Sequence, residues 1–227
     1  MGKSSKVSKN AERNRGAYGE RRVGVREELP KIWVFPDDRV TGPAYFKEVA
    51  RTYRGKAAIM VFPAADSENS PGRVVARAID EAGRAGPDEK ADAVWAVLDC
   101  ESTPSQCSAA LEAKKQAGRE GVKAALSMPS FEVWTLLHLE DTGATFQDAQ
   151  AVTARVLKLW AEHIEPVGAG KSDLDYSKVR KRRKEAVRRA KAHAEKSPRD
   201  PSWTEVYLVI EDIDRLVDRA ENPPAGA

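Results

Sequence analysis

The chain has 227 residues, of which 41% are hydrophobic and 32% are charged, and its formal net charge is +3. This length allows one sizeable core or two small ones, and so small a net charge identifies no partner. No segment approaches the length of an apolar membrane span, the first twenty residues lack the apolar segment of a secretory signal, and two cysteines are too few for a disulfide framework. We therefore expect a cytoplasmic protein with no membrane partner.

Residues 1–28 are basic and polar, and we interpret them as a flexible arm. Beyond them, apolar runs that predict strands alternate with amphipathic segments that predict helices. The expected strands are 31–35, 57–62, 93–98 and 122–127, and the expected helices are 44–52, 72–85, 105–118 and 131–139. This alternation predicts an α/β domain over residues 29–140, with a mostly parallel sheet flanked by helices.

The pattern changes after Gly143, where only helical periodicity remains. We expect an α-helical C-terminal extension over residues 141–220 and a disordered tail over residues 221–227. The expected helices are 146–165, a strongly basic helix 176–196, and 203–220.

Acidic residues follow two of the predicted strands. Asp37 and Asp38 come after the first strand, and Asp99 and Glu101 come after the third. Ligands of an open parallel sheet bind outside the carboxyl ends of its strands, and Mg²⁺ or Mn²⁺ prefers carboxylate oxygens. Such an ion could activate water for phosphodiester cleavage. Acids after strands also occupy turns and helix caps, and the spacing leaves both interpretations open.

Several segments resemble the RloB-like protein family. S-M-P-S-F-E-V-W-T-L-L-H, residues 127–138, resembles the family pattern S-N-P-x-F-E-x-W-x-x-x-H. Residues 37–46 are similar to the family pattern E-G-x-x-T-E-x-x-Y-F, with matches at Thr41, Tyr45 and Phe46. Weaker similarities link residues 99–101 to a D-x-D pattern, 176–178 to Tyr-x-Lys, and 200–206 to N-P-x-T-x-V. Together they span residues 29–217.

This resemblance implies a Toprim-like fold and an anti-phage role in bacterial restriction or abortive infection. It also implies a Mg²⁺-dependent nuclease acting on DNA or RNA, with an ATPase as a partner. Asp37 would be the general acid/base, and Asp99 and Glu101 the metal ligands.

The chain departs from the family pattern at four positions. Asp37 and Glu101 keep the carboxylate with a changed length, Asp38 stands where the pattern has glycine, and Gly42 stands where it has glutamate. A divergent active nuclease, an inactive nucleic-acid-binding or partner-binding module, and an adaptor that binds only protein all fit.

Glu132 and His138 lie in the most specific matching segment. By resemblance, Glu132 would complete the acidic site and both residues would be catalytic. The alternative is an acid at a helix start, stabilised by the helix dipole, and a hydrogen-bonded core histidine.

Residues 178–191 contain nine Lys or Arg residues and one acid, Glu185. Like charges at this density repel one another, and a polyanion would relieve that repulsion. We expect this segment to bind nucleic-acid phosphates. The predicted contact residues are Tyr176, Lys178, Lys181, Arg182, Arg183, Lys184 and Arg188. The alternative is a solvated helix, or one paired with acids such as Glu211, Asp212 and Asp214.

Overall fold

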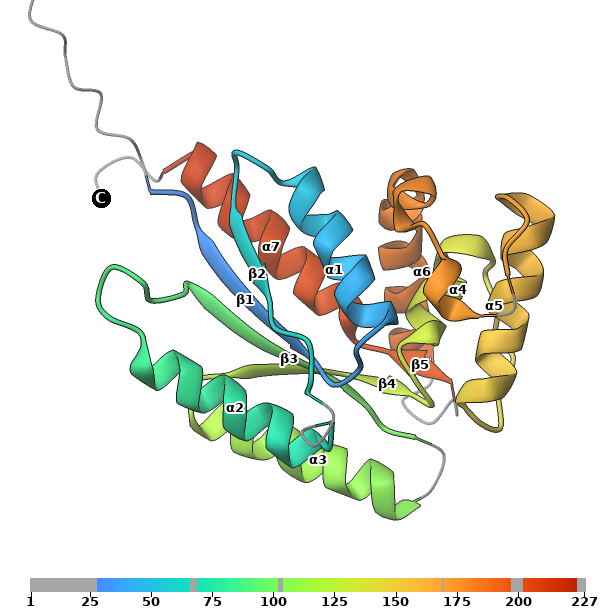
Figure 1. Cartoon of the computed structure of the whole chain (residues 1–227), viewed down its shortest axis with the longest axis horizontal. Helices are drawn as coiled ribbons and strands as arrows, with labels where there is room; N and C mark the ends of the chain where they lie inside the picture. Colours follow the sequence, from blue (N-terminus) through green and yellow to red (C-terminus); the bar gives the residue numbers. More distant parts are fainter. Residues whose placement is uncertain (1–27, 66–68, 102–103, 169, 197–201, 224–227) are drawn as a thin grey trace, which may run out of the picture.

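The computed structural model describes residues 28–65, 69–101, 104–168, 170–196 and 202–223 (Figure 1). Of the two predicted terminal segments, residues 1–27 of the arm and residues 224–227 of the tail lie outside the described residues.

The described residues form one five-stranded sheet of order β2-β1-β3-β4-β5. Strands β1 (Lys31–Pro36), β2 (Ala58–Val61), β3 (Ala93–Asp99) and β4 (Lys123–Met128) are parallel, and β5 (Trp203–Thr204) runs antiparallel to β4. This confirms the predicted α/β class and mostly parallel sheet. Strand β5 was not predicted, because two residues are too few to show a period, and it lies inside the helix expected at 203–220.

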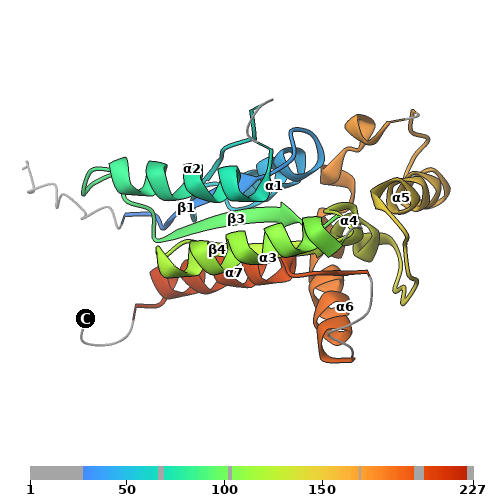
Figure 2. The same cartoon turned by 90° about the horizontal axis from the view of Figure 1, so that it is seen from below.

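Helices cover both faces of the sheet (Figures 1 and 2). Helix α1 (Thr41–Thr52) and the C-terminal α7 (Val206–Glu221) lie on one face, and α2 (Pro71–Arg84) and α3 (Pro104–Arg119) lie on the other. The side chains of each strand alternate between these two layers. In β1, Ile32 and Val34 pack into the α1/α7 layer, while Trp33 and Phe35 pack into the α2/α3 layer.

Helix α7 joins the far end of the chain to the sheet. Its Ile210 and Ile213 are buried in the same core cluster as Ile32 and Val34. Trp95 Nε1 donates a hydrogen bond of 3.0 Å to Asp212, so a polar contact reinforces the apolar packing. One face of the sheet is therefore completed by residues that lie more than a hundred positions later in the chain.

The remaining elements gather near the carboxyl ends of the strands (Figure 1). They are α4 (Glu132–Leu139), α5 (Ala149–His163), the 3₁₀ turns Lys171–Asp173, Tyr176–Lys178 and Arg180–Arg182, and α6 (Arg183–Lys196). None of the described helices has the length and apolar character needed to cross a membrane.

The prediction of a single basic helix over 176–196 is wrong for its first seven residues. These residues form two 3₁₀ turns ahead of α6. Tyr176 and Val179 are buried in the core, and their burial holds this part of the chain in tight turns.

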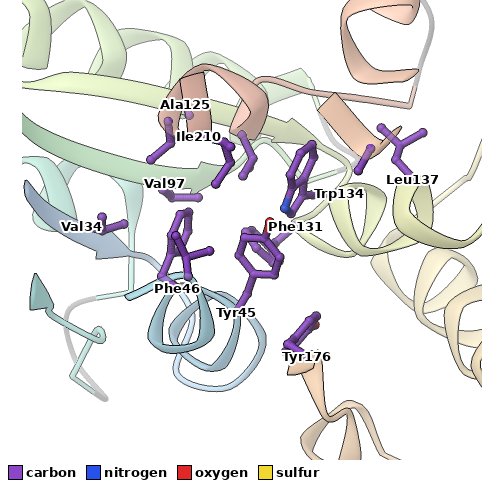
Figure 3. Packing of buried hydrophobic residues seen from close by; sticks show 14 of the residues in the cluster. Val34, Tyr45, Phe46, Val97, Ala125, Phe131, Trp134, Leu137, Tyr176 and Ile210 are labelled. Atoms are coloured by element: carbon purple, nitrogen blue, oxygen red, sulfur yellow. The ribbon is translucent and has the colours of Figure 1, made fainter. Parts of the chain in front are cut away.

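An aromatic cluster around Tyr45 connects α1 to the elements near the strand ends (Figure 3). The Tyr45 ring meets Phe131, Trp134 and Tyr176 edge-on, with centroid distances of 5.7, 5.9 and 5.4 Å. Edge-to-face contacts of this kind stabilise a core beyond the area that they bury. The cluster thus fixes α4 and the 176–178 turn against α1.

Candidate acidic site

Asp37 and Asp99 are held side by side at the ends of adjacent strands. The backbone N–H of Asp37 continues the ladder by donating to Val97 O at 3.0 Å, and the N–H of Asp99 donates to Asp37 Oδ2 at 2.6 Å. Asp99 Oδ1 in turn accepts from the N–H of Phe131 at 2.8 Å, just before α4. The parallel pairing of β1 and β3 therefore places both carboxylates at one edge of the sheet, where ligands of such sheets bind.

The environment of these two carboxylates disfavours their charged forms. Burial raises the pKa of Asp37 to about 7, against a hydrogen bond from Asp99 that lowers it, and the Asp38 charge raises it further. Burial also raises the pKa of Asp99, and the charges of Asp37, Glu132 and Asp38 add to this effect. Without a cation, the pair is thus costly to ionise.

Glu132 lies beside this pair and is almost fully buried, with 1% of its surface exposed. Its Oε1 accepts from Thr41 Oγ1 at 2.9 Å and from Lys171 Nζ at 2.7 Å, and its Oε2 accepts from Ser130 Oγ at 2.7 Å. Burial would raise the pKa of Glu132, but the Lys171 charge and the hydrogen bonds from Lys171, Ser130 and Thr41 together lower it. Glu132 is therefore an ionised carboxylate at the site.

Lys171 was not singled out by the sequence analysis. Burial opposes its charge, but the Glu132 carboxylate raises its pKa, with further contributions from Asp38 and Asp99. It follows a short glycine-containing loop and lies 39 positions from Glu132, in no recognisable pattern. Only the fold places this ammonium among the acids.

Asp38 has a structural role in the turn that starts α1. Its carboxylate accepts from the N–H groups of Thr41 at 2.6 Å and of Gly42 at 3.0 Å, as a capping acid does. A Cβ at position 42 would lie 2.6 Å from Asp38 Oδ1 and 3.0 Å from Pro36 Cβ. The turn interpretation therefore describes Asp38, whose carboxylate occupies space that a side chain at position 42 would need.

Glu101 departs from the expected geometry. Asp99 and Glu101 would point the same way only if the chain stayed extended past β3, but Glu101 has φ +46° and an exposed side chain. Its N–H donates to Pro129 O at 2.9 Å, so the chain turns directly after β3 ends. The expected alignment of Glu101 with Asp99 along one strand face is therefore wrong.

The metal-binding capacity of the site follows from these contacts. Among the described residues, no three His, Cys, Asp or Glu side chains are arranged to hold one metal ion. Asp37 Oδ1 and Asp99 Oδ2 nevertheless accept no hydrogen bond from any described residue. Mg²⁺ usually keeps several waters and takes one or two protein carboxylates. The donor set thus fits a hydrated Mg²⁺ or Mn²⁺ held by Asp37 and Asp99, but not one enclosed by three acids.

Two predicted site residues lie in the core. His138 is buried, with Nδ1 2.9 Å from Trp134 O and Nε2 3.4 Å from Tyr45 Oη, and burial lowers its pKa to about 4. This is the core-histidine arrangement that the sequence left open. Tyr176 is also buried, and its hydroxyl lies 3.1 Å from Thr135 Oγ1 (Figure 3). Neither side chain makes a hydrogen bond to the carboxylates of Asp37, Asp99 or Glu132 within the described residues.

The basic segment divides into paired and unpaired side chains. Lys178 pairs with Glu165 at 3.3 Å, and Lys191 pairs with Glu211 at 2.7 Å. Arg180, Arg183, Arg188 and Arg189 also contact protein groups, among them Glu48, Tyr53 and Glu185. Within the described part of the chain, Lys181, Arg182 and Lys184 show no such partner.

A pocket of about 270 Å³ opens next to the Asp38 turn. It lies between α1 and the 174–177 segment, and its lining includes Arg39, Lys47 and Arg51, together with Glu48 and Asp175. A larger pocket of about 680 Å³ lies at the amino ends of β1 and β3 and contains none of the acids at the site.

The chain is thus an α/β protein with an acidic site at the carboxyl edge of a mostly parallel sheet. The family model for RloB-like proteins matches residues 32–213, and the chain belongs to this family. No curated protein and no solved structure gives a significant match to the chain.

The raised pKa of Asp37 predicts a stability change in the Asp37→Asn variant. The folded pKa of about 7 lies above the ordinary aspartate value of 3.8, so wild type loses stability as pH rises from about 4 to about 7. Asn cannot ionise, so the variant should gain stability relative to wild type, by about 1–3 kcal/mol at pH 8, and less at pH 5. Urea unfolding with EDTA at both pH values measures this, and a difference that does not change with pH would contradict it.

The contact between Asp38 and Gly42 predicts a coupled pair of substitutions. Gly42→Ala should destabilise the fold by about 1–3 kcal/mol, because the new methyl group collides with Asp38. Asp38→Gly should lower stability through loss of the cap, and should relieve much of the cost of Gly42→Ala. Urea unfolding of the two single variants and the double variant gives the coupling energy. Additive effects would show that the two positions act independently.

Proposed function

We propose that this protein is a metal-dependent nuclease that hydrolyses phosphodiester bonds of DNA or RNA at the acidic site. The proposal is carried by one observation, the pairing of the Asp37 and Asp99 carboxylates across adjacent strand ends. Burial raises the pKa of both acids, and the Asp37 charge raises that of Asp99 further, so the pair forms a site that a divalent cation stabilises. When bound, a hydrated Mg²⁺ or Mn²⁺ would supply an activated water and charge for the reacting phosphate.

The chain's own residues have distinct roles in this proposal. Asp37 and Asp99 hold the cation, and the backbone N–H groups of Asp99 and Phe131 fix their orientation. Glu132 holds the Lys171 ammonium at the same edge. His138 is given a structural role, since its ring lies in the core.

Positive charge near the site supports a nucleic-acid substrate. Arg39, Lys47 and Arg51 line the pocket beside the Asp38 turn. Lys181, in the 3₁₀ turn before α6, and Lys184, in the first turn of α6, are exposed and make no ion pair within the described residues. Phosphate contacts of this kind position a backbone without reading its sequence. An anti-phage role and an ATPase partner are part of the proposal through the family resemblance alone.

The test is cleavage of plasmid DNA and of tRNA with Mg²⁺ or Mn²⁺. Asp99→Asn should lower the rate by about 100-fold or more, because it removes a ligand charge while keeping the side chain's shape. Asp148→Asn is the matched control, since Asp148 caps α5 and is not part of the acidic site. Cleavage that survives Asp99→Asn, or that EDTA leaves unchanged, would contradict the proposal.

A second candidate function is nucleic-acid binding without cleavage, and the Lys171–Glu132 pair favours it. An internal ammonium at 2.7 Å already balances one acid of the site. In that case binding should fall steeply with salt, and cleavage should be absent with either metal.

Either function predicts that the unpaired lysines contribute to binding. The double variant Lys181→Gln with Lys184→Gln should reduce the slope of log affinity against log salt for duplex DNA by up to about 2. Arg188→Gln with Lys191→Gln removes the same charge from ion-paired side chains and should change the slope less. Fluorescence anisotropy measures both. Equal changes in the two variants would show that the unpaired lysines have no special part.

A further inference from the structure

The side chain of Lys171 forms an ion pair with a buried carboxylate of the acidic site. Its Nζ lies 2.7 Å from Glu132 Oε1, and its side chain is 39% exposed while that of Glu132 is 2% exposed. The ammonium thus reaches a buried carboxylate from a half-exposed position. A lysine carries its charge on a flexible four-carbon stem, so this end can leave without any change of the backbone.

Both oxygens of Glu132 accept hydrogen bonds in this arrangement. Oε1 accepts from Thr41 and Lys171, and Oε2 accepts from Ser130. A divalent cation binds a carboxylate oxygen at roughly 2.0–2.6 Å, closer than the ammonium lies now. Two cations on one carboxylate repel each other, so the Lys171 ammonium disfavours a metal ion at Glu132.

The same ammonium acts on the other acids of the site. Lys171 is stabilised by charge interactions with Asp38 and Asp99 as well as with Glu132. These acids would equally attract a divalent cation to the pair Asp37 and Asp99. The ammonium therefore weakens that attraction even where it does not occupy a ligand position.

We propose that Lys171 is a built-in competitor of the divalent cation: it neutralises the acidic site in the free protein and must withdraw from Glu132 before the site binds a metal ion tightly. This inference builds on the proposed metal site.

The experiment is Mn²⁺ binding to the full chain, followed by electron paramagnetic resonance of the free ion. Lys171→Gln removes the charge and keeps a donor for Glu132, and Lys171→Met removes both. Each should bind Mn²⁺ about tenfold more tightly than wild type, in the range of ordinary coupling between two ligands. Lys171→Arg keeps the charge and should bind as weakly as wild type.

The control for net charge is Lys158→Gln, which removes an exposed ammonium on α5. It should leave the Mn²⁺ affinity close to that of wild type. Unchanged or weaker binding in Lys171→Gln would overturn the inference, and so would an equal gain in Lys158→Gln. Thermal unfolding verifies that each variant is folded. If Lys171→Met does not fold, Lys171→Gln alone tests the inference.

A second pair of variants separates this inference from the metal site itself. Asp37→Asn with Asp99→Asn should abolish Mn²⁺ binding if the two acids form the site. If that double variant binds Mn²⁺ like wild type, the proposed site is refuted. If it abolishes binding but Lys171→Gln changes nothing, the site stands and only the competition by Lys171 is refuted.

Discussion

The buried carboxylate of Glu132 is the interaction on which the arrangement at the sheet edge depends. It connects Thr41 at the start of α1, Ser130 in the turn after β4, and Lys171 beyond α5. An unpaired charge at this depth would cost several kcal/mol, so the three partners and the carboxylate must come together. Because Thr41 directly follows the Asp38 turn and Ser130 directly precedes Phe131, this one group also holds the segments that position Asp37 and Asp99.

The departures from the family pattern at positions 38 and 42 have a common physical origin. The pattern has glycine and glutamate there, and this chain has Asp38 and Gly42. Asp38 turns its carboxylate onto the N–H of Gly42, in the space that a side chain at position 42 would need. The turn therefore keeps one acid and one glycine with their positions exchanged. This explains the unusual Asp38 without requiring that the site has decayed.

The sequence predicted what depends on local periodicity. Apolar runs identified the four parallel strands and amphipathic segments identified the helices, and the rule for parallel sheets brought Asp37 and Asp99 together. It failed where distant residues decide the outcome. Burial of Tyr176 breaks the expected basic helix, the positive φ of Glu101 turns the chain away from β3, and Lys171 meets Glu132 only through the fold. Ion pairs occupy most of the cationic side chains of the basic segment and leave a few unpaired. Composition cannot tell paired from unpaired side chains.

The position of α7 on the sheet has a consequence for how this protein is made. Trp95 and Asp212 lie 117 residues apart, so at typical rates of synthesis roughly 6–20 s pass between them. When synthesis of α7 begins, every acid of the site is already in the chain, but until then this face of the sheet has no C-terminal helix to cover it. A nascent chain therefore carries the chemical groups of the site before it has the core that fixes them. Translation itself delays the formed site until the last helix has left the ribosome.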